Sequence, residues 1–84
     1  MDRVEWVRSA RRELANIWMI TVDKNAVTSA ANYTERLLMI DPTLEGIAIP
    51  RSLRRVFVTP LTVEYRVNVR QQLVSIAWVQ LGKV

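Results

Sequence analysis

The sequence predicts an α+β fold: a short N-terminal strand, an antiparallel helix hairpin, then a three-stranded antiparallel sheet. Two observations carry this prediction. Residues 9–40 hold apolar side chains at helical spacing, in two segments separated by a short break. From Leu53 onward the apolar period changes from 3.6 to 2, which is the spacing of strands. Because helices and strands are segregated along the chain, we expect the helix pair to cover one face of a mostly antiparallel sheet.

The first strand and the first helix are predicted from residues 4–21. The segment Val4 to Val7 is short, apolar and rich in β-forming residues, and Ser9 after it is the expected N-cap of a helix. One face of this helix carries five side chains at helical spacing, namely Ala10, Leu14, Ile17, Trp18 and Thr21. We expect the three tryptophans, Trp6, Trp18 and Trp78, to lie mostly in the core, and Trp18 above all.

The second helix is predicted from residues 23–41. Asp23 or Asn25 can cap its N-terminus, and Pro42 disfavours helix at the residue before it, so the helix should end near Asp41. Its apolar face is formed by Val27, Ala30, Ala31, Thr34, Leu37 and Leu38. The short connection between the two helices favours an antiparallel pair.

The strands follow a turn at residues 42–46 and a segment, 47–52, that we expect to be irregular. Residues 54–59 read as a strand. In residues 61–70 apolar and polar side chains alternate strictly, which predicts one buried and one solvated face. Residues 73–79 are apolar on both faces, which is typical of an interior strand. Its two neighbours should be the 61–69 strand and the N-terminal strand.

The composition of the chain excludes several classes of function. The chain has 84 residues, enough for a single domain (1–84), with no Cys and no His. Disulfides, thiol nucleophiles and histidine bases are therefore excluded. Two glycines cannot build a phosphate-binding glycine-rich loop. No carboxylates are paired at catalytic or metal-binding spacing, so we expect no metal and no cofactor. No apolar run is long enough for a membrane span, and the charged N-terminus does not resemble a signal peptide, so we expect a cytoplasmic protein.

The charge is distributed unevenly along the chain. Residues 46–84 hold six basic side chains against Glu64 alone, although the net charge of the whole chain is only +4. This half of the chain favours a polyanion or an acidic protein as partner. A second basic cluster, Arg8, Arg11 and Arg12, lies on the polar face of the first predicted helix. The alternative for both clusters is a solvated surface without a partner.

The candidate site residues come from the basic half. Without His or Cys, phosphate chemistry must rest on Arg, Lys, Tyr or Glu, which act by positioning and by charge stabilisation. Alternation places Tyr65 on the buried face of its strand, where it is part of the core rather than catalytic. The candidate catalytic residues are Arg54, Arg55 and Arg66, and the candidate residues for binding a target or nucleic acid are Arg54, Arg55, Arg66, Arg70 and Lys83. The alternative is that these are exposed sheet arginines, with Glu64 paired to one of them across strands.

Several segments, taken in order, resemble a known family. Residues 4–6 followed by 9–17 resemble its opening strand and first helix, and residues 30–46 its second helix and "P-x-x-G" turn. Residues 53–55, 60–67 and 74–79 resemble its remaining strands. The family is that of the RelE/ParE toxins, the small bacterial toxins of type II toxin–antitoxin pairs, once labelled plasmid-stabilisation proteins. The resemblance covers nearly the whole chain.

The resemblance implies a toxin that inhibits growth and is neutralised by a cognate antitoxin. Its target would be translation, through the ribosome and its mRNA, or DNA gyrase. Gln80 stands where family members commonly have His, and Lys83 stands near their Arg. The residues of the ribosome-dependent RNases are not visible, which favours the ParE-like branch. The alternatives are a small basic nucleic-acid-binding or interaction module, and an inactivated toxin homologue.

Overall fold

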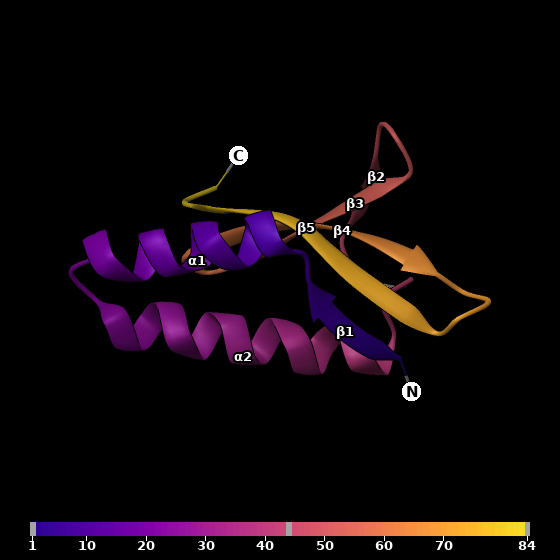
Figure 1. Cartoon of the computed structure of the whole chain (residues 1–84), viewed down its shortest axis with the longest axis horizontal. Coiled ribbons are helices and arrows are strands. Elements are labelled where there is room, and N and C mark those ends of the chain that lie inside the picture. The colour runs from indigo at the N-terminus through magenta and orange to yellow at the C-terminus, as the bar shows by residue number, and fades with distance from the viewer. Residues whose placement is uncertain (1, 44, 84) are drawn as a thin grey trace.

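The computed structural model describes residues 2–43 and 45–83. It has two layers, a helix hairpin and a sheet, and Figure 1 shows both helices on one side of the strands. The predicted α+β class and the position of the helices are confirmed. The elements in chain order are β1 (Arg3–Trp6), α1 (Arg8–Ile20), α2 (Lys24–Ile40), β2 (Ile47–Ile49), β3 (Leu53–Val58), β4 (Leu61–Asn68) and β5 (Leu73–Leu81).

The sheet has five strands in the order β1-β5-β4-β3-β2, so the prediction of three strands is too low. β1 runs parallel to β5, with Val4 opposite Val74 and Trp6 opposite Ile76. The other neighbouring pairs are antiparallel. The prediction that β5 is interior, between the N-terminal strand and β4, is confirmed. The first and the last strand of the described residues are therefore neighbours.

The strand β2 corrects a second expectation. Residues 47–52 were expected to be irregular, but Ile47–Ile49 pairs antiparallel with β3, and Ile49 lies opposite Leu53. In the turn between them, Arg51 and Ser52 have φ angles of 70° and 61°. Hairpin turns of positive φ normally carry Gly, Asn or Asp, so this hairpin has no sequence signal of the usual kind.

The two helices begin in different ways. α1 starts at Arg8, its N-cap is Val7, and no side chain caps it, so the prediction of Ser9 as N-cap is wrong. The backbone N–H of Val7 donates to the carbonyl of Ile76 at 2.9 Å, and the chain passes directly from the sheet into the helix. Asp23 caps α2 as predicted, since its carboxylate accepts a hydrogen bond of 3.0 Å from the N–H of Ala26. α2 ends at Ile40, beside the predicted Asp41.

The core lies between the helix hairpin and the inner face of the sheet, that is, the face that the helices cover. On α2 the predicted face is confirmed, with Val27, Ala30, Ala31, Thr34 and Leu38 buried. On β4 two predictions are wrong: Thr62, on the face predicted to be solvated, is buried, and Val69, assigned to the buried face, is exposed beyond the end of the strand. The sheet contributes Leu61, Val63, Tyr65, Val74, Ile76 and Val79 to the core.

Two tryptophans lie at the surface rather than in the core. Trp18 is 44% exposed and Trp78 is 37% exposed, whereas Trp6 is half-buried and packs against the core. α1 packs on β5 through the buried residues Ala10 and Ile17, which leaves Trp18 at the edge of the helix pair. There the Nζ of Lys24 lies 4.7 Å from the centroid of its ring. The helical spacing of Trp18 correctly predicted the side of α1 on which it lies, but it did not predict how far its side chain is buried.

The turn after α2 is held by two side chains from the sheet. The Tyr65 hydroxyl, in the core as predicted, lies 2.9 Å from the carbonyl oxygen of Pro42 and 2.6 Å from that of Glu45. Arg54 donates to the carbonyls of Glu45 and Gly46 at 3.1 and 3.3 Å. Burial raises the pKa of Tyr65, so its hydroxyl keeps the proton that it donates to these carbonyls. Leu44, within this turn, lies outside the described residues.

Candidate functional site

The face of the sheet that points away from the helices, here called the outer face, carries most of the predicted site residues. Cross-strand pairs place Arg55 beside Glu64, Phe57 beside Thr62, and Arg66 beside Ser75. These residues alternate along their strands with core residues such as Val63 and Tyr65, which fixes the direction in which they point.

Arg54 and Arg55 lie on opposite faces of β3, as neighbours in a strand must. Arg54 is used to hold the turn after α2. Arg55 donates from Nε at 3.0 Å and from Nη2 at 2.8 Å to the same carboxylate oxygen of Glu64. The two side chains are 31% and 15% exposed. The expected alternative, a pair between Glu64 and a cross-strand arginine, is present, and Arg55 retains some access to solvent.

Arg66, Arg70 and Lys83 are exposed. Within the described part of the chain, the side chains of Arg66 and Arg70 make no hydrogen bond or ion pair. Arg66 lines an open hollow together with Asn68, Gln71 and Ser75, near the hairpin that joins β4 to β5. Arg70 lies in that hairpin. These arginines are free to contact an anion.

Lys83 and Arg55 belong to a different hollow, of about 260 Å³, which we call the Phe57 hollow. Phe57 is 41% exposed, and the Nζ of Lys83 lies 5.8 Å from the centroid of its ring. The lining consists of Gly46, Ile47, Arg55, Val56, Phe57, Thr62 and Lys83. The five predicted basic residues therefore do not converge: Arg55 and Lys83 share one hollow, Arg66 and Arg70 lie near another, and Arg54 supports the turn.

Phe57 was not among the residues singled out from the sequence. The signal for it is the pattern Val56-Phe57-Val58: the two valines pack against the core, so the residue between them must point to the outer face. Thr62, opposite Phe57, is buried because its hydroxyl donates to the carbonyl of Gly82, and the segment after β5 covers it. The Gly82 N–H in turn donates to the carbonyl of Pro60 at 2.7 Å.

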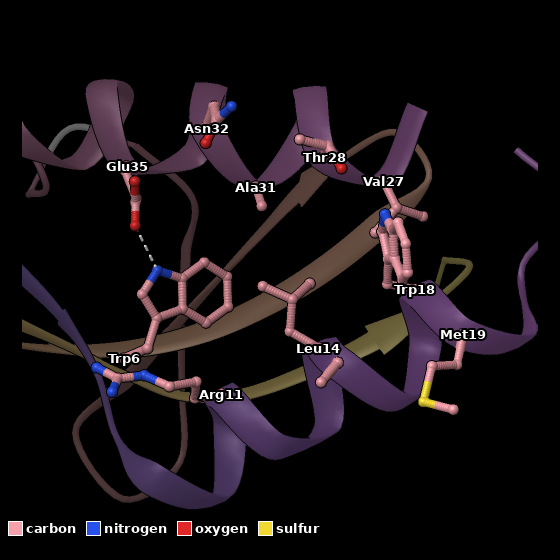
Figure 2. A pocket seen from close by; sticks show the side chains of 11 residues that line it. Trp6, Arg11, Leu14, Trp18, Met19, Val27, Thr28, Ala31, Asn32 and Glu35 are labelled. Atoms are coloured by element: carbon pink, nitrogen blue, oxygen red, sulfur yellow. Dashed lines mark hydrogen bonds between the residues drawn. The ribbon is translucent and has the colours of Figure 1, made fainter. Parts of the chain in front are cut away.

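A strongly apolar hollow lies on the other layer, between α1 and α2, and we call it the interhelical groove. Its volume is about 470 Å³, and Figure 2 shows Leu14 between the rings of Trp6 and Trp18. At one end, Trp6 Nε1 donates to Glu35 Oε1 at 2.7 Å. The lining consists of Trp6, Arg11, Leu14, Ala15, Trp18, Met19, Val27, Thr28, Ala31, Asn32 and Glu35. This groove was not predicted from the sequence, because Trp18 was expected to lie in the core.

The groove offers apolar surface that the chain itself leaves uncovered. Met19, beside Trp18 in the lining, is among the most exposed apolar side chains of α1. Arg11 stands at the rim, and Arg8 and Arg12 are exposed on the same helix. A partner segment with apolar side chains flanked by acidic ones would complement this surface.

The described residues form neither a metal site nor a membrane-spanning helix. Among residues 2–43 and 45–83, no three side chains of the metal-ligating types gather in one place. No helix within the same residues has the length and apolar character needed to cross a membrane.

Among known proteins, solved structures resemble this chain in fold. Neither a protein-family model nor a curated protein matches the sequence. The toxin–antitoxin complex RelBE2 from Mycobacterium tuberculosis contains a chain that superposes with a TM-score of 0.80 at 17% identity, covering 95% of this chain and 96% of that one.

Two other solved structures share the arrangement. A chain of the chromosomal ParDE system from P. aeruginosa has a TM-score of 0.71 at 15% identity, covering 99% of this chain and 98% of that one. The isolated RelE toxin from E. coli has a TM-score of 0.71 at 8% identity, covering 100% of this chain and 87% of that one. Each match extends over the helix hairpin and the sheet together. The chain has the RelE/ParE toxin fold.

Proposed function

We propose that this protein is the toxin of a type II toxin–antitoxin pair, which arrests growth until a cognate antitoxin binds it. The observation that carries the proposal is the match of nearly the entire chain to three toxin or toxin–antitoxin structures. Two of those structures, RelBE2 and ParDE, are toxin–antitoxin systems, which supports an antitoxin as the partner of this chain as well.

The interhelical groove is the surface that suits the antitoxin. It is apolar, it lies between two helices, and its rim on α1 is basic through Arg11. An amphipathic segment with an acidic edge would bury the apolar lining of the groove and neutralise this rim. A domain of 84 residues has a small core, so burial of such a surface would also stabilise it.

The outer face is the surface that suits the target. Arg66 and Lys83 lie on it and Arg70 lies in the hairpin between β4 and β5, all three without an acidic side-chain partner among the described residues, while Arg55 is held by Glu64. Translation and DNA gyrase both remain targets under this proposal. We favour a non-RNase action, because Gln80 and Lys83 replace the His and Arg that family members commonly carry.

The first test is growth of a bacterial host after controlled induction. We expect arrest with the wild-type chain, and recovery of growth to that of the empty vector when Arg66, Arg70 and Lys83 are all changed to Ala. The variant Arg8→Ala/Arg12→Ala/Arg36→Ala removes three exposed charges from the helices instead, and it should still arrest growth. Unimpaired growth with folded wild-type protein in the lysate would contradict the proposal.

A second test addresses the antitoxin surface. Ala15 is exposed and lines the groove, and Asn16, the next residue, is exposed outside it. With the cognate antitoxin co-expressed, we expect Ala15→Glu to restore arrest, because a carboxylate in an apolar interface opposes binding. Asn16→Glu should remain neutralised. Equal neutralisation of both variants would place the antitoxin elsewhere on the chain.

The basic outer face also favours a second candidate, a nucleic-acid-binding module without toxicity. This candidate predicts unaffected growth together with binding to nucleic acid that weakens steeply as salt is added. Growth and binding measured on the same preparation separate the two candidates.

A further inference from the structure

We propose that a hollow between α1 and the end of β5 binds an organic cation, namely the alkylguanidinium or alkylammonium group of a protein side chain or of a polyamine. We call it the Trp78 hollow, and its volume is about 360 Å³. The inference goes beyond the toxin role and does not depend on it, because it concerns the ligand chemistry of one hollow. It rests on an exposed ring that no cation covers, on a carboxylate without a partner, and on an apolar floor.

The hollow lies where β5 extends beyond its neighbour β1. β1 ends at Trp6, opposite Ile76, and the chain turns into α1, whereas β5 continues to Leu81. Along this last part of β5 the hollow is lined by residues of α1 on one side and of the strand on the other. α1 and β5 pack on each other through the buried side chain of Ala10, so the walls of the hollow are fixed by the core.

Trp78 is an exposed aromatic residue of β5, with 37% of its surface accessible. Two other exposed rings of this chain each have a lysine beside them. The Nζ of Lys24 lies 4.7 Å from the centroid of the Trp18 ring, and the Nζ of Lys83 lies 5.8 Å from that of Phe57. Trp78 has no such cation among the described residues. Because an indole is the best aromatic face for a cation, its ring is open to one from another molecule.

Glu13 supplies negative charge on the α1 side of the hollow. Its carboxylate is exposed and makes no hydrogen bond or ion pair within the described part of the chain. Its helical neighbours, the residues three and four positions away, carry no charge; they are Ser9, Ala10, Asn16 and Ile17. An unpaired carboxylate facing a hollow is notable in a chain whose net charge is +4, and it attracts a cation.

Ser9 and Gln80 line the same hollow and add two side-chain oxygens that can accept hydrogen bonds. Neither side chain has a hydrogen-bond partner among the described residues. Guanidinium and ammonium groups carry several N–H donors and no acceptor, so a carboxylate together with neutral oxygens satisfies them. The described residues of the lining include no arginine or lysine, which disfavours an anion.

The floor of the hollow is apolar and consists of small side chains. Ala10 and Val79 are buried and Ala77 is half-buried, which leaves room for the methylene stem that long cationic groups lay along apolar surface. The volume lies within the range of roughly 300–1,000 Å³ that is typical of ligand pockets. A metal ion is not suited, because Glu13 is the only carboxylate among the described residues of the lining.

The test is an NMR titration of the isotope-labelled chain with three ligands at equal ionic strength: N-acetyl-arginine amide, spermidine and N-acetyl-citrulline amide. Citrulline has the shape of arginine without its charge. We expect saturable shifts of the Trp78 indole N–H and of the Glu13 backbone N–H with both cations, and none with the citrulline derivative. Tighter binding of the arginine derivative would identify a protein side chain as the ligand, and tighter binding of spermidine a free polyamine.

Matched variants locate the site. We expect Glu13→Gln and Trp78→Leu each to weaken binding about two- to fivefold, the effect of one exposed ion pair or one cation–π contact. Glu5 is an exposed carboxylate of β1 paired with Arg3, and Trp18 is an exposed indole with its own lysine, so Glu5→Gln and Trp18→Leu should leave the affinity unchanged. Shifts that do not saturate, equal binding of the citrulline derivative, or equal losses for Trp78→Leu and Trp18→Leu would overturn the proposal, whatever the growth assay shows.

Discussion

Replacing Ile76 by alanine will lower the free energy of unfolding by about 2–5 kcal/mol, the range for truncation of a large buried side chain. Ile76 is fully buried in β5, which lies between β1 and β4. Trp6 and Tyr65 are its register partners on either side, so the cavity would open in the middle of the core. For a domain of this size each kcal/mol shifts Tm by roughly 4–8 °C.

Urea titration and thermal unfolding followed by circular dichroism measure this effect. The matched control is Ile40→Ala, because Ile40 is 77% exposed at the end of α2. A surface change of this kind should stay within about 0.5 kcal/mol of the wild type. Similar losses for the two variants would show that β5 does not form the centre of the core.

The second large effect is expected at Gly46. Replacing Gly46 by alanine will destabilise the fold by about 2–3 kcal/mol, at the upper end of the range for a non-glycine residue held in an unfavourable conformation. Gly46 has a φ of 71°, and an added Cβ would lie 2.5 Å from the Arg55 carbonyl oxygen and 3.2 Å from the Tyr65 hydroxyl oxygen. The turn held by Tyr65 and Arg54 would have to shift.

Gly82→Ala separates the two causes of this loss. Gly82 also has a positive φ, 95°, but apart from its two chain neighbours no atom of the described residues lies within 4 Å of the position that its Cβ would take. Only the conformational cost remains there, about 1 kcal/mol. If the two variants lose equal stability in urea titration, the close approach at Gly46 contributes nothing.

The sequence predicted those elements whose burial follows directly from periodicity. The alternation in β4 placed Leu61, Val63 and Tyr65 correctly in the core, and the helical spacing in α2 did the same for Val27 and Leu38. In both segments one face packs against a complete neighbouring layer, so the pattern of apolar residues and the pattern of burial coincide.

The features that were missed depend on contacts between distant segments. β2 is three residues long and turns through Arg51 and Ser52, so neither its length nor its turn gives a signal. Thr62 is buried by the returning C-terminal segment rather than by its own strand. Trp18 lies on the predicted side of α1, but it borders a groove. Periodicity does not show whether a second layer covers a residue.

For the candidate site, the sequence indicated the charged residues but not most of the contacts that they make. The basic half of the chain and the Glu64 pair were visible in the sequence, and the opposite directions of Arg54 and Arg55 follow from alternation. The partners of Arg54 are carbonyls of Glu45 and Gly46, which no residue pattern encodes. Phe57 was overlooked because an aromatic residue in a strand is more often part of the core.

The neighbouring positions of β1 and β5 bear on when the fold can form during synthesis. Among the strands of this sheet β5 is synthesised last, yet it lies between β1 and β4 and carries most of the packing against α1. The N-terminal strand and the first helix must therefore wait for residues 73–81 to leave the ribosome exit tunnel. The core closes only after β5 has been made, so a nascent chain that lacks this strand has neither the interhelical groove nor the outer face in its final form.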